Sequence, residues 1–204
     1  MTPVVRLLIV ANAIVFGLQQ FVDDGLFTHF ALWPLGHHYV PGFGFVGFEP
    51  WQLVTTAFLH GGFPHIAINM FVLWSFGTIV ERTVGSRRFT WLYFASVLSA
   101  SLVQLWVVTA TLEGGAVPTV GASGGVFGVL LAFAFLFPQA RMIVFPIPIP
   151  MKAWILVTAY AVIELASGVF GTMQGVAHFA HLGGMVGAAA VLLYWRSRRG
   201  ATQA

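Results

Sequence analysis

The stretch VPTVGASGGVFGVLLAFAFLFP (residues 117–138) places one serine at the start of a long apolar run. No charged residue occurs between Ser123 and Phe137, and Pro138 ends the run because proline cannot continue a helix. The residues next to the serine are glycine and alanine, which leave its backbone free of bulky neighbours. The stretch therefore predicts a helix in apolar surroundings with a polar side chain in its first turn.

The rest of the chain is also apolar. Of its 204 residues, 58% are hydrophobic and only 7% are charged, whereas soluble domains carry about 25% charged residues. A chain of this composition cannot cover itself with polar surface, so we expect a multi-pass membrane protein. Six spans with short loops would use almost the whole length, so residues 1–204 are expected to form a single domain. The absence of cysteine excludes a disulfide framework, a thiolate metal site and a cysteine nucleophile.

Six apolar segments approach the length of about 20 residues that a transmembrane helix needs. They lie near residues 3–22, 64–81, 89–111, 123–137, 151–170 and 177–195. The first segment lacks the small-residue cleavage site of a signal peptide, so it is interpreted as a helix. Residues 23–63 form a long connection rich in aromatic residues and glycine, which we expect to lie partly in the membrane interface. The predicted fold is an all-α bundle of six transmembrane helices.

The basic residues all fall on one side of this six-span arrangement. They are Arg6, Arg82, Arg87, Arg88, Arg141, Lys152, Arg196, Arg198 and Arg199. The loops on the other side carry no lysine or arginine and hold the carboxylates Asp23, Asp24, Glu49 and Glu113. Because lysine and arginine are enriched in cytoplasmic loops, both termini are expected in the cytoplasm. No basic run is interleaved with aromatic residues, so no nucleic-acid partner is expected.

This topology brings four polar residues from three helices into the outer leaflet. Ser123 and His181 lie near the starts of the fourth and sixth segments, and His65 and Asn69 stand one turn apart in the second. The helix from Ser123 to Phe137 is about 22 Å long, against a hydrocarbon core of about 30 Å. Ser123 is therefore expected roughly 8 Å below the outer boundary, and His181 about 6–7 Å along its own helix.

Small residues predict a close contact between the fourth and sixth helices. They are spaced four apart, at Gly124 and Gly128 on the fourth helix and at Gly183, Gly184, Gly187 and Ala188 on the sixth. Membrane helices with this spacing approach backbone to backbone. Ser123 and His181 can then meet.

These residue types suit acyl transfer. A serine hydroxyl becomes a strong nucleophile when a base takes its proton, and histidine is the usual base. Free N–H groups at the helix start at Ser123, with side-chain donors from His65 and Asn69, can stabilise an oxyanion. No carboxylate is well placed as a third member, so we predict a Ser–His dyad whose base is oriented by packing or by a neighbour other than aspartate. The G-x-S-x-G spelling is that of a nucleophile elbow, but no strand precedes it.

The chain resembles the rhomboid family of intramembrane serine proteases, in its small six-helix bacterial form. The resemblance runs from about residue 30 to 190 through ALWPLG, PWQLVTTAFLHGGFPHIAINM, VERTVGSRRF, GASGGVFG and VAHFAHLGGMVG, in that order. The family's G-x-S-G motif falls on Gly121 to Gly124, which implies that Ser123 is the nucleophile. Its A-H-x-x-G motif ends at Gly184, which implies that His181 is the base.

The same resemblance implies roles for two polar residues of the second predicted helix. The H-x-x-x-N pattern falls on His65 and Asn69, which implies that they are the oxyanion side chains, and His60 matches a further histidine whose role is more structural. Some members carry a Trp-Arg pair where this chain has Trp51 and Gln52. The motif E-x-R is also altered, and Ala188 replaces a glycine of some members.

Several ionisable residues stay outside these assignments. His178, one turn before His181, competes as the base but is interpreted as polar packing near the outer surface. Glu164 lies inside the fifth segment, where it is either protonated, hydrogen-bonded to a neighbouring helix, or involved in gating or in orienting a histidine. His29, His37 and His38 lack metal-ligand spacing, so no metal site is expected.

The leading hypothesis is a serine endopeptidase that, by the resemblance, cleaves transmembrane segments of other proteins near the outer face, without a cofactor. Its partners would be those substrates and the lipid bilayer, and its location a bacterial inner membrane. One alternative is a catalytically inactive rhomboid-like protein that binds membrane clients, although such relatives usually lack the serine or the histidine. Another is a small transporter, which would show a conducting path or repeats.

Overall fold

The computed structural model describes residues 1–22, 24–111, 116–144, 147–172 and 175–201. Asp23 and Glu113, two of the carboxylates assigned to the outer loops, lie outside the described residues. The helices are α1 (Pro3–Gln19), α2 (Gly25–Phe30), α3 (Gln52–Thr55), η1 (Thr56–Phe58), α4 (Phe63–Val72), η2 (Leu73–Gly77), α5 (Thr78–Val84), α6 (Ser86–Ala110), α7 (Ser123–Leu136), α8 (Ala153–Phe170) and α9 (His178–Ala201). Two antiparallel hairpins pair β1 (His38–Val40) with β2 (Gly44–Val46), and β3 (Arg141–Val144) with β4 (Ile147–Lys152).

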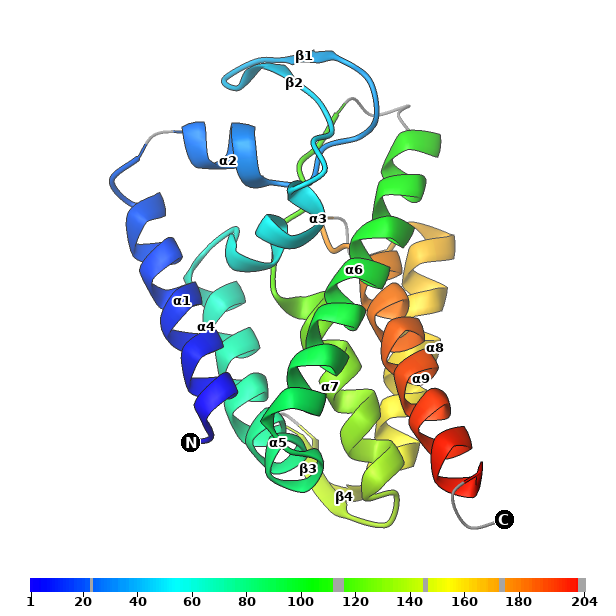
Figure 1. Cartoon of the computed structure of the whole chain (residues 1–204). Helices are drawn as coiled ribbons and strands as arrows, with labels where there is room; N and C mark the ends of the chain where they lie inside the picture. The colour runs from blue at the N-terminus through cyan, green and yellow to red at the C-terminus, as the bar shows by residue number, and fades with distance from the viewer. Residues whose placement is uncertain (23, 112–115, 145–146, 173–174, 202–204) are drawn as a thin grey trace.

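Each predicted apolar segment is a helix in the described part of the chain. Four helical stretches are long and apolar enough to cross a membrane, namely Phe63–Val84, Ser86–Ala110, Ala153–Phe170 and His178–Arg198. The first of these joins α4 and α5 through the π-helical turn η2. Helices α1 and α7 are apolar but shorter. The fold is therefore mostly helical, with four long apolar helices and two shorter ones, and Figure 1 shows them packed side by side.

The outer surface of these helices is apolar. Large hydrophobic side chains are exposed along their length, among them Leu7, Trp91, Trp106, Phe170 and Val186. Water-soluble monomers rarely expose apolar surface on this scale, because its burial drives folding and association in water. Lipid is the solvent that such a surface fits.

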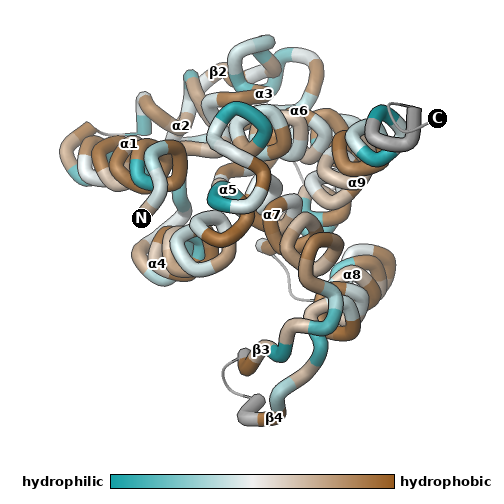
Figure 2. The backbone as a smooth tube through the Cα atoms, turned by 60° about the horizontal axis from the view of Figure 1, so that its bottom comes forward, coloured by the Kyte–Doolittle hydropathy of each residue, from teal (hydrophilic) through white to brown (hydrophobic). Residues whose placement is uncertain are grey.

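Polar elements gather at the two ends of the bundle. The long connection forms α2, the β1–β2 hairpin and α3 at one end, whereas both chain termini, α5 and the β3–β4 hairpin lie at the other (Figure 1). Figure 2 views the second end and shows hydrophilic residues in α5 and at the end of α9, with the β3–β4 hairpin extending beyond α8. The described lysine and arginine residues belong to α5, to the β3–β4 hairpin, to the end of α9 and to the first turns of α1 and α6.

Side-chain hydrogen bonds order the long connection between α1 and α4. Gln52 is fully buried, and its amide oxygen accepts the backbone N–H of Trp33 at 3.2 Å while its amide nitrogen donates to Gly47 C=O at 3.2 Å. His60 exchanges two hydrogen bonds of its backbone with the side chain of Gln19, at 2.9 and 3.1 Å. The neutral glutamine at position 52 therefore organises the connection through backbone contacts, and His60 ties its end to α1.

Helices α6, α7 and α9 pack against one another at glycine contacts. A Cβ on Gly184 would overlap the carbonyl oxygen of Gly124 and lie 2.7 Å from its carbonyl carbon. The predicted backbone contact between these two helices is thus present. Gly183 and Gly187 face α6 instead, where added Cβ atoms would lie 3.0 Å from Ala100 Cα and 2.6 Å from the carbonyl oxygen of Ala95. The small residues of α9 therefore serve two neighbouring helices.

One buried carboxylate holds the start of α1. Glu81 accepts the backbone N–H groups of Val4 and Val5, at 3.1 and 2.9 Å, and the hydroxyl of Ser86 at 2.7 Å. The first N–H groups of a helix have no partner within it, and a negative charge is favourable at this end. Glu81 therefore has a structural role at the end of the bundle that carries the termini.

Candidate active site

Ser123 is the first residue of α7, and the turn before it is fixed by the long connection. The backbone N–H of Gly121 donates to Thr56 C=O at 3.0 Å, and Thr119 exchanges two backbone hydrogen bonds with Leu32. Gly121 has φ +131°, in a region that side chains disfavour. The turn that presents the serine therefore depends on the long connection and on a glycine two residues before Ser123.

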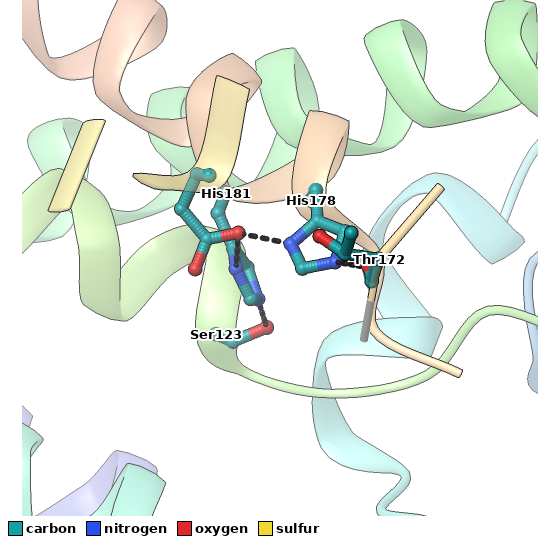
Figure 3. A network of polar contacts seen from close by, with 5 residues as sticks. Ser123, Thr172, His178 and His181 are labelled. Atoms are coloured by element: carbon teal, nitrogen blue, oxygen red, sulfur yellow. Dashed lines mark hydrogen bonds and ion pairs between the residues drawn. The ribbon is translucent and has the colours of Figure 1, made fainter. Parts of the chain in front are cut away.

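Ser123 and His181 meet between α7 and α9. Nε2 of His181 lies 2.8 Å from Oγ of Ser123, within hydrogen-bond distance (Figure 3). His181 is buried and Ser123 is half-buried. The contact is possible because Gly124 and Gly184 let the two helices touch. A histidine that carries its proton on Nδ1 can accept the serine proton at Nε2 in this geometry.

The imidazole of His181 is stacked on an aromatic ring. The ring centroids of Phe127 and His181 are 4.2 Å apart and their planes differ by 8°. Phe127 stands four residues after Ser123 on α7, so both side chains project from one face of the helix toward α9. Phe127 was not predicted from the sequence, although its i, i+4 spacing from Ser123 was a usable signal.

A carboxylate lies at the Nδ1 edge of the His181 ring. Oε2 of Glu164, on α8, lies 3.0 Å from Nδ1 of His181 and 2.6 Å from Nδ1 of His178, and Nε2 of His178 lies 3.1 Å from the carbonyl oxygen of Thr172. Figure 3 shows His178 and His181 flanking this point. The prediction that no carboxylate is well placed near the base is wrong, because helical packing brings α8 against α9. His178 is buried in this network, which confirms its interpretation as polar packing.

His65 lies against the turn that carries the serine. A Cβ on Gly121 would meet its ring at 2.7 and 2.8 Å, and its ring contacts that of His60 edge to face at 5.0 Å. Asn69 is buried one turn further along α4, and within the described residues its side chain makes no hydrogen bond to Ser123 or His181. Burial, reinforced by the neighbouring His65, lowers the pKa of His60 to about 4.

A small cavity adjoins the serine. Its volume is about 20 Å³, and its polar lining includes Ser123, Thr119 and Gln104. The amide nitrogen of Gln104 donates to the hydroxyl of Thr119 at 3.3 Å, whereas its buried amide oxygen has no partner among the described residues. A cavity of this size, with the unpaired oxygen of Gln104 in its wall, has room for one water molecule.

No metal cluster accompanies these groups in the described part of the chain. No set of three or more histidine, cysteine, aspartate or glutamate side chains lies close enough together to bind an ion. His29, His37 and His38 belong to the long connection, away from the serine.

Most of the chain matches a known protein domain. Residues 47–198 match the Rhomboid domain. The chain belongs to the rhomboid family. It is 38% identical to the mitochondrial Rhomboid protein 1 of Saccharomyces cerevisiae over 65% of this chain and 38% of that protein. It is 33% identical to the Rhomboid protease GluP of Bacillus subtilis over 68% of this chain and 25% of that protein.

Another rhomboid relative is mitochondrial presenilin-associated rhomboid-like protein A of Danio rerio, with 32% identity over 65% of this chain and 34% of that protein. The chain spans less than half the length of the curated relatives it matches. The family and the apolar helices together make this chain a multi-pass membrane protein.

Proposed function

We propose that this rhomboid chain is a serine endopeptidase that cleaves transmembrane segments of other membrane proteins near the outer leaflet. The observation that carries the proposal is the 2.8 Å contact between Ser123 Oγ and His181 Nε2, made by two different helices of an apolar bundle. A serine paired with a histidine in such surroundings is an activated nucleophile. The printed name of the Bacillus subtilis relative, a rhomboid protease, supports the same activity.

The reaction follows from the positions of these groups. His181 takes the proton of Ser123 through Nε2 while Oγ attacks the scissile carbonyl, and it then gives that proton to the leaving amine. The oxyanion forms beside the start of α7, where backbone N–H groups have no partner within the helix. We assign His65, and Asn69 behind it, as the side-chain donors. Gly121 and Gly124 provide the space, and His60 supports His65 through its ring contact.

Water is needed for the second half of the reaction. The acyl-enzyme is an ester of Ser123, and hydrolysis requires one water molecule with His181 again acting as base. The cavity beside Ser123 is large enough for one water and offers the amide oxygen of Gln104 as an acceptor. Hydrolysis can therefore proceed at a site surrounded by apolar helices.

We also propose that residues 1–204 form one domain with six spans, counting the shorter α1 and α7. Lysine and arginine residues gather at the end of the bundle that carries both termini, which supports cytoplasmic termini in a bacterial inner membrane. The site would then open to the extracytoplasmic side. Reporter fusions after Thr119 and after Ala204 test this topology, because the two should report opposite sides.

Activity is tested with purified protein in detergent and a fluorogenic transmembrane substrate. Ser123→Ala and His181→Ala should abolish cleavage, and a fluorophosphonate should label the wild type but not Ser123→Ala. Ser96→Ala is the matched control, since this buried α6 serine only bonds to Leu92 C=O of its own helix. Asn69→Ala should lower turnover by roughly 10²-fold, as expected for one oxyanion donor.

Two results would contradict the proposal. Cleavage that persists in Ser123→Ala and His181→Ala would show that these two residues are not the catalytic dyad. Binding of a transmembrane segment by the wild type without any cleavage would favour the alternative of an inactive client-binding protein. An unchanged rate in Asn69→Ala would remove only Asn69 from the site.

A further inference from the structure

Glu164 is a buried carboxylate in an apolar helix, and the Ser–His reaction does not by itself explain it. Its side chain is about one-tenth exposed. Ionisable groups in membrane helices are costly and are retained where a partner stabilises them. The two partners here are His178 and His181, which approach the same oxygen, Oε2, through their Nδ1 atoms.

The hydrogen bonds of His178 determine where its protons are. A carbonyl oxygen only accepts, so the contact of Nε2 with Thr172 C=O at 3.1 Å requires a proton on Nε2. At the other nitrogen, one proton lies between Nδ1 and Oε2 of Glu164, which are 2.6 Å apart. With that proton on nitrogen, His178 is an imidazolium and Glu164 a carboxylate. The pair is then neutral as a unit, which reduces the cost of burying it.

The ionised oxygen determines the tautomer of His181. Oε2 lies 3.0 Å from Nδ1 of His181, and an electron-rich oxygen at this distance favours a proton on that nitrogen. Nε2 then presents its lone pair to the hydroxyl of Ser123. The N–H direction at Nδ1 lies outside hydrogen-bond geometry, so the carboxylate acts on the neutral ring through charge–dipole attraction, and the contact becomes an ion pair only when His181 is protonated. Such contacts often tighten when substrate binds.

Stacking alone does not specify this orientation. The parallel ring of Phe127 fixes the plane of the imidazole, but a ring flipped by 180° about its Cβ–Cγ bond would stack equally well. That rotation would exchange the two edges of the ring. A charged partner at one edge distinguishes the two orientations, and in the described residues that partner is Glu164.

We propose that Glu164 and His178 form a positioning pair that fixes the Nδ1–H tautomer of His181 and stabilises the imidazolium formed during acylation. The Oγ–H bond of Ser123 breaks as the bond from Oγ to carbon forms, and the proton moves to Nε2 of His181. The positive charge then lies beside Oε2 of Glu164, which accepts no proton. The proton leaves with the departing amine, and the pair returns to its initial state. This inference rests on the proposed function.

Kinetics provide the first test. Glu164→Gln keeps the shape of the side chain but loses its charge, and the amide can favour the Nε2–H tautomer of His181. We therefore expect kcat to fall by about 10²–10⁴-fold with KM nearly unchanged, as for triad carboxylates elsewhere. Glu164→Asp should recover part of the loss. Glu81→Gln is the matched control, because the hydrogen bonds of this buried glutamate with Val4, Val5 and Ser86 lie at the starts of α1 and α6, on other helices than Ser123 and His181. It should lower the melting temperature and leave kcat unchanged.

Nitrogen NMR provides a second test that does not need activity. In protein labelled with ¹⁵N-histidine and embedded in lipid, His181 and His178 are identified by the signals missing from His181→Asn and His178→Asn. The wild type should show His181 protonated on Nδ1 and His178 on both nitrogens. In Glu164→Gln, His178 should become neutral and the Nδ1–H form of His181 should no longer dominate.

The outcomes separate this inference from the proposed function. An active wild type, an inactive Ser123→Ala variant and an unchanged kcat in Glu164→Gln would overturn the positioning pair alone. An inactive wild type would overturn the proposed function, and the NMR result would still decide the tautomer. If Glu164→Gln does not fold, Glu164→Asp and His178→Asn replace it. Wild-type spectra and rates in both would overturn the inference.

Discussion

We predict that Gly184→Ala, which disturbs the contact between Gly124 and Gly184, slows the proposed reaction. In Gly184→Ala, the new Cβ would lie 2.7 Å from the carbonyl carbon of Gly124 and 3.0 Å from its Cα. Carbon atoms pack at about 3.5–4.0 Å, so the two helices must separate by roughly 1 Å. These are backbone atoms, which cannot rotate away as a side chain would. Overpacking of this kind costs about 1–3 kcal/mol of stability.

The same displacement reaches Ser123 and His181, the proposed catalytic pair, directly. Ser123 is the neighbour of Gly124, and His181 lies three residues before Gly184, so their 2.8 Å contact should open beyond hydrogen-bond distance. A misplacement of about 1 Å costs up to roughly 10²-fold in rate. We therefore expect kcat of Gly184→Ala to fall by about that factor, with fluorophosphonate labelling slowed in parallel.

The assay compares cleavage rate, labelling rate and thermal unfolding with those of Gly17→Ala. Nothing lies within 4 Å of an added Cβ at Gly17 in α1, so this control should leave both rates unchanged. It should also be slightly more stable, since alanine suits a helix better than glycine. A wild-type kcat in Gly184→Ala would show that the helix contact does not set the geometry of the pair.

Two further predictions concern side chains around the site. Because the pKa of His60 is about 4 in the folded chain and about 6.5 in an unfolded one, the unfolded state takes up the proton first as pH falls. Stability should therefore drop by up to about 3 kcal/mol between pH 6.5 and pH 4, and His60→Phe should show a flatter profile in thermal unfolding; an equally steep profile would exclude His60 as the cause. Phe127→Ala removes the ring stacked on His181 at 4.2 Å, and kcat should fall by about fivefold, in line with about 1 kcal/mol for an aromatic pair. A rate equal to the wild type would mean that Phe127 does not restrain the base.

Hydropathy predicted most of the helical layout, because lipid-facing segments must be both apolar and long. The six predicted segments and the observed helices agree to within a few residues at most ends, for example 123–137 against Ser123–Leu136. The internal order of residues 24–62 was not predicted. It depends on Gln52 and His60 bonding to distant backbone atoms, and such contacts leave no periodic pattern in the sequence.

The residues near the serine were predicted unevenly for a similar reason. Ser123, His181 and His65 stand in spaced motifs, so their residue types and positions indicated a shared site. Glu164 stands in no motif, and its contact with His181 depends on how α8 is rotated against α9. Its one signal was a charge within an apolar segment, which indicates a partner but does not identify it.

The last three helices supply the serine, the carboxylate and the two histidines in chain order. Ser123 comes from α7, Glu164 from α8, and His178 and His181 from the first turn of α9. During synthesis, a chain that has inserted α7 but not α9 carries the serine without its base. Under the proposed function, hydrolytic competence therefore arises only when α9 enters the membrane. Until then, the order of biosynthesis would protect neighbouring nascent membrane proteins.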